Sequence, residues 1–444
     1  METGRDKGRL PAAAGLAAAA VVFAALLNLY PNPLAPLVLV LLTGAVGVFV
    51  FRPRFFVLAC LFLRASLDIT KDGGAIYLSE SIQITAALLL SLLVVVLGIF
   101  HILAHRVRVW RIPLVPVLSV FLAVSLLNCL ATEDLLSSLM EWMRFLSTFV
   151  LYILVSELVR TRDDAVRVAS AIMLSALVPV AVGLYQILEN AGQYITGFVR
   201  ANGTFVHPNP FAFYLIIVLS LLLNFLFAGA ANPFSRFRGR MALLALPAAV
   251  CLVFTYTRTA WIGIFILFFF IVVARDRRLL WGFGALGLVF FAAGPLRQRF
   301  SDLMTSFNSV THRFYIWKSG LEKLPRYPVL GRGLASFELL DPYGEPAHND
   351  ALRILFELGI VGVLVYVALG VELTARLWRL FRRDLGPVGN ALARAAVSSL
   401  AVFILASLTG NIFFRPALQW YFWALAALVF RMGSIAGAEA GGDE

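Results

Sequence analysis

The sequence has few charged residues for its length. Asp, Glu, Lys and Arg make up 14% of its 444 residues, about half their share in soluble globular chains, whereas 61% of the residues are hydrophobic. With a mean hydropathy of +0.88, such a chain cannot hide its apolar surface inside one soluble core. The composition therefore excludes a soluble enzyme, a disordered scaffold and a DNA-binding domain as the main body of the protein.

Cysteines and metal-ligand patterns are also scarce. The three cysteines, Cys60, Cys129 and Cys251, all fall inside apolar segments without metal or disulfide spacing, so we interpret them as inert buried thiols. No cluster of His, Cys and Asp has metal-ligand spacing, and the sequence contains neither a Gly-x-Ser-x-Gly motif nor a Walker loop. We therefore expect a protein that uses no metal and no other cofactor.

What the sequence has instead is a series of long apolar runs. A helix that crosses a bilayer needs about 20 apolar residues. Candidate runs lie near residues 12–30, 34–51, 55–67, 82–103, 113–130, 141–160, 165–188, 210–228, 241–257, 260–274, 279–293, 351–378, 390–410 and 416–431. The runs 55–67, 260–274 and 279–293 are short, and the sequence leaves open whether two of the short runs span the membrane. The expected fold class is all-α: a polytopic integral membrane protein with about 12–14 transmembrane helices.

The basic residues indicate how these helices are oriented. The net charge of +12 comes from short clusters between apolar runs, which is a topology signal and no sign of nucleic-acid binding. Every second loop is basic if both termini are cytoplasmic, so the opposite loops face outward. The first run, 12–30, follows Arg5, Lys7 and Arg9, but a second run begins almost at once, so we expect a retained anchor and no signal peptide.

The same topology predicts the organisation of the chain. We expect a helical bundle over 1–293, an external segment over 294–350, C-terminal transmembrane helices over 351–432 and a frayed cytoplasmic tail over 433–444. Within the external segment, the spacing of Phe314, Trp317, Leu321 and Leu324 predicts a helix with one apolar face that lies along the membrane interface.

Two polar clusters fall on the predicted external face. In the first, Arg258 lies in a tight turn among hydroxyl and aromatic residues, and it either binds an oxyanion or reaches to the interface beside aromatic anchors. In the second, Arg200, Asn202, His207 and Asn209 belong to the loop 200–211, which either has the polarity of a sugar-binding loop or is a turn that opens the next helix at Asn209 and Pro210.

The third candidate is His348, which immediately precedes a strongly apolar helix. Asn349 or Asp350 is the expected N-cap of that helix. The positive end of a helix disfavours imidazolium and lowers the pKa of histidine, so neutral imidazole, the form that can take a proton, is expected near neutral pH. The alternative is a histidine that is merely hydrogen-bonded at the junction. His101 and His105 lie toward the basic side, and His312 fits a surface residue.

Together these residues predict an external site with several arginines and a poised histidine. Guanidinium groups suit phosphate oxygens. Since no ATP is available outside the cytoplasm, a reaction there is expected to use an activated, lipid-linked donor.

At these residues the chain resembles the O-antigen ligase and polymerase superfamily of bacterial inner-membrane glycosyltransferases, most closely its ligase branch. Five segments carry the resemblance, which spans about Arg200 to Tyr366. They are 200–211, 257–261, 313–318, 328–337 and the stretch from His348 to Gly359, in which ten residues separate the histidine from the glycine.

The resemblance implies a reaction and roles for its residues. Ligases of this superfamily transfer a glycan from undecaprenyl diphosphate to the lipid A core at the periplasmic face, without metal or nucleotide and with inversion of the anomeric centre. Carried over, His348 is the general base, and Arg258 and Arg313 bind the diphosphate and stabilise its departure. Arg200, Asn202, Asn209, Asn349 and Asp350 are the implied substrate-binding residues, and Arg144 and Arg332 are further unranked candidates.

The acceptor is left open by the resemblance. The superfamily also includes polymerases, which join lipid-linked repeat units to one another, and enzymes that glycosylate proteins. Sugar composition and oligomeric state are not fixed either. A transporter of lipid-linked sugars is an alternative from another class, but transporters tend to have repeated halves and broken helices at the midplane. The polar residues here gather at one face, which favours an enzyme.

Overall fold

The computed structural model describes residues 35–70, 76–79, 82–130, 132, 134–195, 198–228, 233–275, 281, 284, 309–324, 327–340 and 344–440. The predicted runs 12–30 and 279–293 lie wholly or almost wholly outside these residues, as does part of the predicted external segment. The chain divides into two compact units, residues 1–60 and 61–444. In the first unit, Phe49 of α2 (Ala35–Phe51) packs edge to face on Phe56 of α3 (Pro53–Leu63), with ring centroids 5.0 Å apart.

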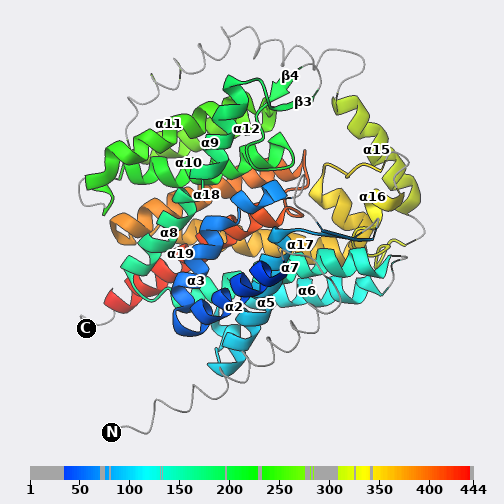
Figure 1. The fold of residues 1–444 in the computed structure, drawn as a ribbon, viewed down its shortest axis with the longest axis horizontal. Helices are drawn as coiled ribbons and strands as arrows, with labels where there is room; N and C mark the ends of the chain where they lie inside the picture. The colour runs from blue at the N-terminus through cyan, green and yellow to red at the C-terminus, as the bar shows by residue number, and fades with distance from the viewer. Residues whose placement is uncertain are drawn as a thin grey trace. The chain divides into compact units, whose positions relative to one another are not determined.

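The described part of the second unit consists mainly of helices joined by turns (Figure 1). The helices are α5 (Ala86–Ala104), α6 (Val115–Cys129), α7 (Leu135–Leu158), α8 (Arg162–Leu174), α9 (Leu177–Leu188), α10 (Pro208–Leu226), α11 (Arg238–Phe254), α12 (Arg258–Arg275), α15 (Ser309–Lys323), α16 (Ser336–Leu340), α17 (Asp350–Phe381), α18 (Gly386–Ser407) and α19 (Pro416–Ala440). Short 3-10 helices cover Ser66–Ile69, Val109–Arg111 and Ser235–Phe237.

Strands are few and short in the described residues. β1 (Ile76–Ser79) pairs antiparallel with β2 (Ile82–Ile84), with Ile76 opposite Ile84 and a register shift between Tyr77 and Ser79. β3 (Gln193–Ile195) pairs antiparallel with β4 (Phe198–Arg200), and Gln193 lies opposite Arg200. The second hairpin ends at Arg200, one of the site residues predicted from the sequence.

The membrane-protein prediction is confirmed. Eight helical segments in the described residues are long and apolar enough to cross a membrane: Ala86–Ala104, Leu135–Leu158, Arg162–Leu188, Pro208–Leu226, Ser235–Phe254, Asp350–Phe381, Gly386–Ser407 and Pro416–Glu439. Shorter apolar helices cover Pro53–Leu63, Val115–Cys129 and Arg258–Ile271. Each predicted run within the described residues coincides with one of these helices or with α2. The protein is an all-α, multi-pass membrane protein.

The helices of the second unit pack around α10, α18 and α19. α10 contacts α18, α11 and α12, whereas α19 contacts α7 and α18. Small residues allow close approach: a Cβ at Gly263 of α12 would lie 2.7 Å from Ile216 of α10 and 2.8 Å from Val402 of α18. Ser220 of α10 donates to the Ala395 carbonyl of α18 at 2.9 Å. α17 packs on α6 and α18, and both α15 and α16 pack on α17 (Figure 1).

Two segments differ in detail from the sequence prediction. The expectation that residues 433–444 fray is wrong up to Ala440, because α19 continues to that residue and Glu439 forms an ion pair with Arg162 at 2.6 Å. Residues 441–444 lie outside the described residues. The predicted helix from Thr311 is present as α15, but its buried face centres on Ile316, whereas Phe314 is 60% exposed. α15 thus packs on the protein through one stripe and leaves apolar side chains exposed on another.

Candidate functional site

The two sequence clusters around Arg200 and Arg258 come together in the structure. The Arg200 side chain is buried, and its Nε donates to the Thr255 carbonyl at 2.7 Å. Its Nη2 donates to Asn209 Oδ1 at 2.8 Å and to Thr257 Oγ1 at 3.1 Å. Arg200 therefore ties the loop 200–211 to the turn that ends in Arg258, the half-buried first residue of α12.

Gln186 of α9 is hydrogen-bonded to the sharpest turn of the loop 200–211, at Asn202 and Gly203. Gly203 has φ of +56°, and a Cβ there would lie 2.8 Å from both the Phe211 ring and the Pro179 carbonyl, so only glycine fits. The Gln186 side chain accepts from the backbone N–H groups of Asn202 and Gly203 at 3.0 and 2.8 Å. The Asn202 side chain donates back to the Phe205 carbonyl of the same loop.

His207 closes this loop and opens α10. Its Nδ1 accepts from the backbone N–H of Asn209 at 3.1 Å, so the ring caps the helix, and Pro208 is the first helical residue. The helix-opening interpretation of this segment therefore holds, and Asn209 at the same time accepts from Arg200. Burial lowers the pKa of His207 to about 3, and the positive charges of Arg200 and Arg415 add to the effect.

His348 lies at the corresponding junction before α17. Asn349 is the N-cap, and its Oδ1 accepts from the Leu352 N–H at 3.0 Å. His348 itself has φ of +51°. Burial is the largest cause that lowers its pKa, to about 4, followed by the charges of Arg313 and Arg415. The imidazole is therefore neutral at pH 7, in the direction expected from the sequence, although burial and not the helix end is the main reason.

α15 brings Arg313 to this junction. Trp317, one turn further along α15, donates from Nε1 to the Ala347 carbonyl at 2.7 Å. Ile316 packs with Phe337, Ala347 and Phe356 in a small core beneath. Burial lowers the pKa of Arg313, and its charge acts on His348. The structure thus gathers Arg313 and His348 at one place, although they are far apart in the sequence.

The loop between α18 and α19 is attached to the same helix end. The Asn349 N–H donates to Asn411 Oδ1 at 3.1 Å, and the Phe413 N–H donates to Asp350 Oδ2 at 3.1 Å. Asn349 and Asp350, expected as substrate-binding residues, are therefore engaged in capping α17 and holding this loop. The last residue of the loop, Arg415, acts electrostatically on both His207 and His348.

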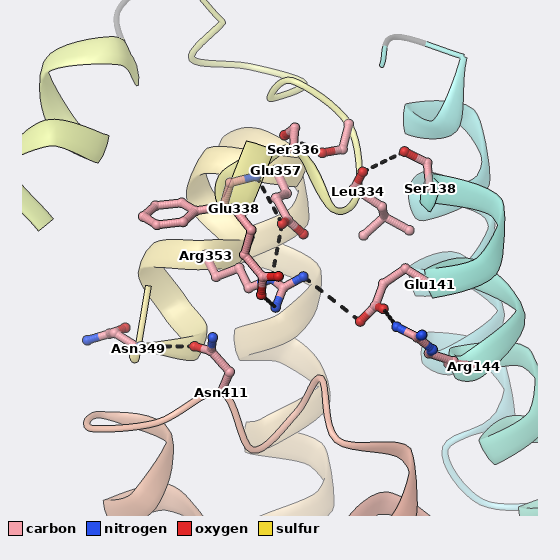
Figure 2. A network of polar contacts seen from close by, with 12 residues as sticks. Ser138, Glu141, Arg144, Leu334, Ser336, Glu338, Asn349, Arg353, Glu357 and Asn411 are labelled. Atoms are coloured by element: carbon pink, nitrogen blue, oxygen red, sulfur yellow. Dashed lines mark hydrogen bonds and ion pairs between the residues drawn. The ribbon is translucent and has the colours of Figure 1, made fainter. Parts of the chain in front are cut away.

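Behind this site, Arg353 of α17 joins three glutamates from three helices (Figure 2). It pairs with Glu357 on its own helix at 3.0 Å, with Glu338 of α16 at 3.1 Å and with Glu141 of α7 at 4.0 Å. Glu141 also pairs with Arg144 on α7. The guanidinium of Arg353 stacks over the Phe414 ring, 4.0 Å from its centroid. This cluster, named here the Arg353 cluster, holds α7, α16 and α17 together.

The helix that follows His348 is broken at Gly359. At Gly359, with φ of +64° and ψ of −166°, α17 is not helical, and its backbone pairs with the segment 328–333 instead. Arg332 N–H donates to the Phe356 carbonyl at 3.1 Å, and Ile360 N–H donates to the Pro328 carbonyl at 3.0 Å. The break fixes the segment that leads into α16 and Glu338.

Sequence reasoning missed the Arg353 cluster and Arg415. Arg353 and Glu357 lie four residues apart inside a predicted apolar helix, and ionisable residues in such helices usually pair. That signal could have found the pair on α17, but the partners from α7 and α16 depend on packing. Arg332, an unranked candidate, stacks on Tyr327, 5.0 Å from the ring centroid. Among the residues that the structure describes, no group of three or more His, Cys, Asp or Glu side chains could hold a metal ion.

Comparison with known proteins relates part of the chain to polysaccharide ligases. Residues 242–367, which include Arg258, Arg313 and His348, match the family model described as O-antigen ligase. A protein named "Putative polysaccharide ligase" from Rickettsia bellii (strain RML369-C) is 27% identical over 185 residues, which cover 38% of this chain and 42% of that protein. A protein with the same description from Rickettsia conorii (strain ATCC VR-613 / Malish 7) is 36% identical over 76 residues, or 14% of this chain and 18% of that protein.

The chain thus spans less than half the length of either relative. The matched region contains Arg258, Arg313, His348 and Gly359. Within its multi-pass helical fold, the chain thus carries a region similar to the O-antigen ligase family.

Proposed function

We propose that this protein is an O-antigen ligase that transfers a glycan from undecaprenyl diphosphate to the lipid A core, at the periplasmic face of a bacterial inner membrane. One observation carries the proposal: a neutral histidine, His348, stands among guanidinium groups at the end of a membrane helix. A neutral imidazole can accept a proton, and guanidinium groups bind diphosphate. The alternate basic loops of the sequence support an outward-facing site.

In the proposed reaction, a hydroxyl oxygen of the acceptor attacks the anomeric carbon of the glycan. His348 takes the hydroxyl proton as general base, and a new glycosidic bond forms. The bond between the anomeric carbon and the diphosphate oxygen breaks, and its electron pair leaves with undecaprenyl diphosphate. Attack opposite the leaving group inverts the anomeric centre. Arg258 and Arg313 stabilise the negative charge that develops on the diphosphate.

The residues around Arg200 have a supporting task in this proposal. Arg200 and Asn209 hold each other and Thr257, and Asn202 is tied to its own loop. We assign to them the wall that faces the sugar and places Arg258. Asn349 and Asp350 hold His348 on α17.

The low pKa of His348 has a use in such a site. An imidazole with a pKa of about 4 is a weak base while the site is empty. The donor brings a diphosphate whose negative charge offsets the neighbouring cations, and this raises the pKa of His348 toward neutrality. The base therefore becomes strong enough only when the donor is in place.

The test is glycan transfer by the purified protein, given an undecaprenyl-diphosphate-linked glycan with or without lipid A core. A product that forms only with lipid A core supports the ligase. Lengthening of the lipid-linked glycan without core assigns the polymerase reaction instead. No product under either condition refutes transfer and directs attention to transport of the lipid-linked sugar.

The role of His348 is tested with two histidine variants. We expect His348→Ala to abolish transfer while the purified protein keeps its thermal stability near neutral pH. His105→Ala is the control, since His105 is exposed at the end of α5 and stacks on His101. Activity retained by His348→Ala would exclude the general-base assignment.

A further inference from the structure

Arg415 is the last residue before α19, and its side chain differs from those of the other arginines at the site. Arg353 forms ion pairs with three glutamates, and Arg144 forms one with Glu141. Arg200 donates hydrogen bonds to backbone and side-chain oxygens. Within the part of the chain that the structure describes, the guanidinium of Arg415 makes no hydrogen bond and no ion pair. Its five N–H donors are available to a ligand.

The side chain of Arg415 is exposed to solvent, whereas that of Phe414 before it is buried. Burial nevertheless lowers the pKa of Arg415, and charges from α7, α16 and α17 act on it. Solvent therefore reaches a guanidinium that lies near ionisable groups of three helices.

Arg415 connects the two histidine junctions of the site. Burial is the main cause that lowers the pKa of His207, before α10, and of His348, before α17, and the positive charge of Arg415 adds to both shifts. Arg313 acts on His348 from α15. Cations from α15 and from the loop before α19 therefore lie near two neutral imidazoles, and none of these four groups is negatively charged.

The backbone holds Arg415 in a fixed position. Its N–H donates to the Ile412 carbonyl at 3.2 Å, and its carbonyl accepts from the N–H groups of Leu418 and Gln419 at 3.0 and 3.1 Å. Asn411 and Phe413, in the same loop, are bonded to the end of α17 that carries His348. Hydrogen bonds thus link the loop that carries Arg415 to the helix end that carries His348.

An accessible guanidinium without an ion-pair partner, near other cations, favours the binding of an anion such as phosphate. We propose that Arg415 is a further substrate-binding residue, whose guanidinium holds a phosphate group of the donor diphosphate between His207 and His348. The inference rests on the proposed function and adds to it a cation from outside the matched family region, which ends at residue 367. It also assigns the loop 408–415 to the binding of the leaving group.

The binding test uses farnesyl diphosphate as a short diphosphate lipid and farnesol as the same lipid without phosphate. Wild type and Arg415→Gln are compared as full-length protein in nanodiscs, with Arg376→Gln as the matched control. Arg376 pairs with Glu372 near the other end of α17. We expect Arg415→Gln to bind farnesyl diphosphate about 10 to 100 times more weakly, because charge-assisted hydrogen bonds are lost. The control and the binding of farnesol stay unchanged.

A second measurement needs no variant and so does not depend on whether the glutamine form folds. Phenylglyoxal labels accessible arginines, and mass spectrometry quantifies the label on Arg415 with and without farnesyl diphosphate. Protection of Arg415, with Arg376 as the internal reference, supports the proposal. Equal labelling of Arg415 in both samples overturns it.

The outcomes separate this proposal from the proposed function. If the wild type transfers glycan and Arg415→Gln binds farnesyl diphosphate within twofold of it, the role of Arg415 is refuted while the ligase function stands. If the wild type neither transfers glycan nor binds farnesyl diphosphate, both fail. A selective loss of diphosphate binding and a raised KM for the donor in Arg415→Gln support both.

Discussion

Gly359 offers a quantitative test of how α17 is built, because one methyl group there has two separate costs. Its φ of +64° and ψ of −166° form a combination that is essentially restricted to glycine, and other residues lose about 1–3 kcal/mol in such regions. In addition, a Cβ at this position would lie 2.2 Å from the Val329 carbonyl oxygen and 2.6 Å from the Gly331 nitrogen. The two backbones must therefore separate in Gly359→Ala.

Separation breaks the hydrogen bonds that α17 shares with the segment 328–333. The bonds from Ile360 to Pro328 and from Arg332 to Phe356 are 3.0 and 3.1 Å long, and each contributes about 0.5–1.5 kcal/mol. With the dihedral cost, Gly359→Ala is expected to lower the free energy of unfolding by about 2–6 kcal/mol.

The assay is unfolding of the purified protein in detergent, followed by tryptophan fluorescence, with Gly370→Ala as the control. Gly370 lies on the same helix with ordinary φ and has no atom within 4 Å of an added Cβ. We expect that control to be unchanged or more stable by up to about 1 kcal/mol, because alanine favours helix. A Gly359→Ala protein within about 1 kcal/mol of wild type would refute this account of the break.

Two further predictions concern charge. Arg353→Met leaves Glu141 and Glu357 without their shared cation, so it should lower the free energy of unfolding by about 3–5 kcal/mol. Glu338→Gln changes a side chain that is 45% exposed and should lower it by less than about 1 kcal/mol. Equal unfolding free energies of the two variants would contradict the Arg353 cluster. The pKa of His348, about 4, lies below its ordinary value of 6.5, so the unfolded chain binds more protons between these values. The free energy of unfolding should therefore fall as the pH is lowered from 6.5 to 4, and His348→Asn should show a shallower fall than wild type.

The helical architecture could be predicted from the sequence because the signal is local. A run of apolar residues has few alternatives to a spanning helix, and the helices of the described residues follow these runs. Helix ends were predictable where a side chain caps them, as Asn349 does for α17. The prediction failed at residues 433–440, because small and acidic residues indicate a frayed end only until a partner such as Arg162 is found for Glu439.

The candidate site was predictable in its parts and not in its assembly. Arg313 and His348 stand out as polar residues on an apolar chain, and their segments carry the family resemblance. Nothing in the sequence shows that Arg200 is used up on Asn209 and Thr257, or that Arg415 has no such partners. The contact of Arg200 with Thr257 joins residues 57 positions apart in the sequence, so it depends on how the helices pack.

The Arg353 cluster also bears on competition for the anion site. Glu141 and Glu338 lie close enough to Arg415 to act on it electrostatically, so these carboxylates compete with a diphosphate for its guanidinium. Arg353 engages both carboxylates and Glu357 as well, and Arg144 engages Glu141 from the other side. Because Arg353 forms ion pairs with these carboxylates, they neutralise less of the positive charge of Arg415. Loss of the Arg353 side chain should therefore weaken the affinity of Arg415 for an anion even in molecules that remain folded.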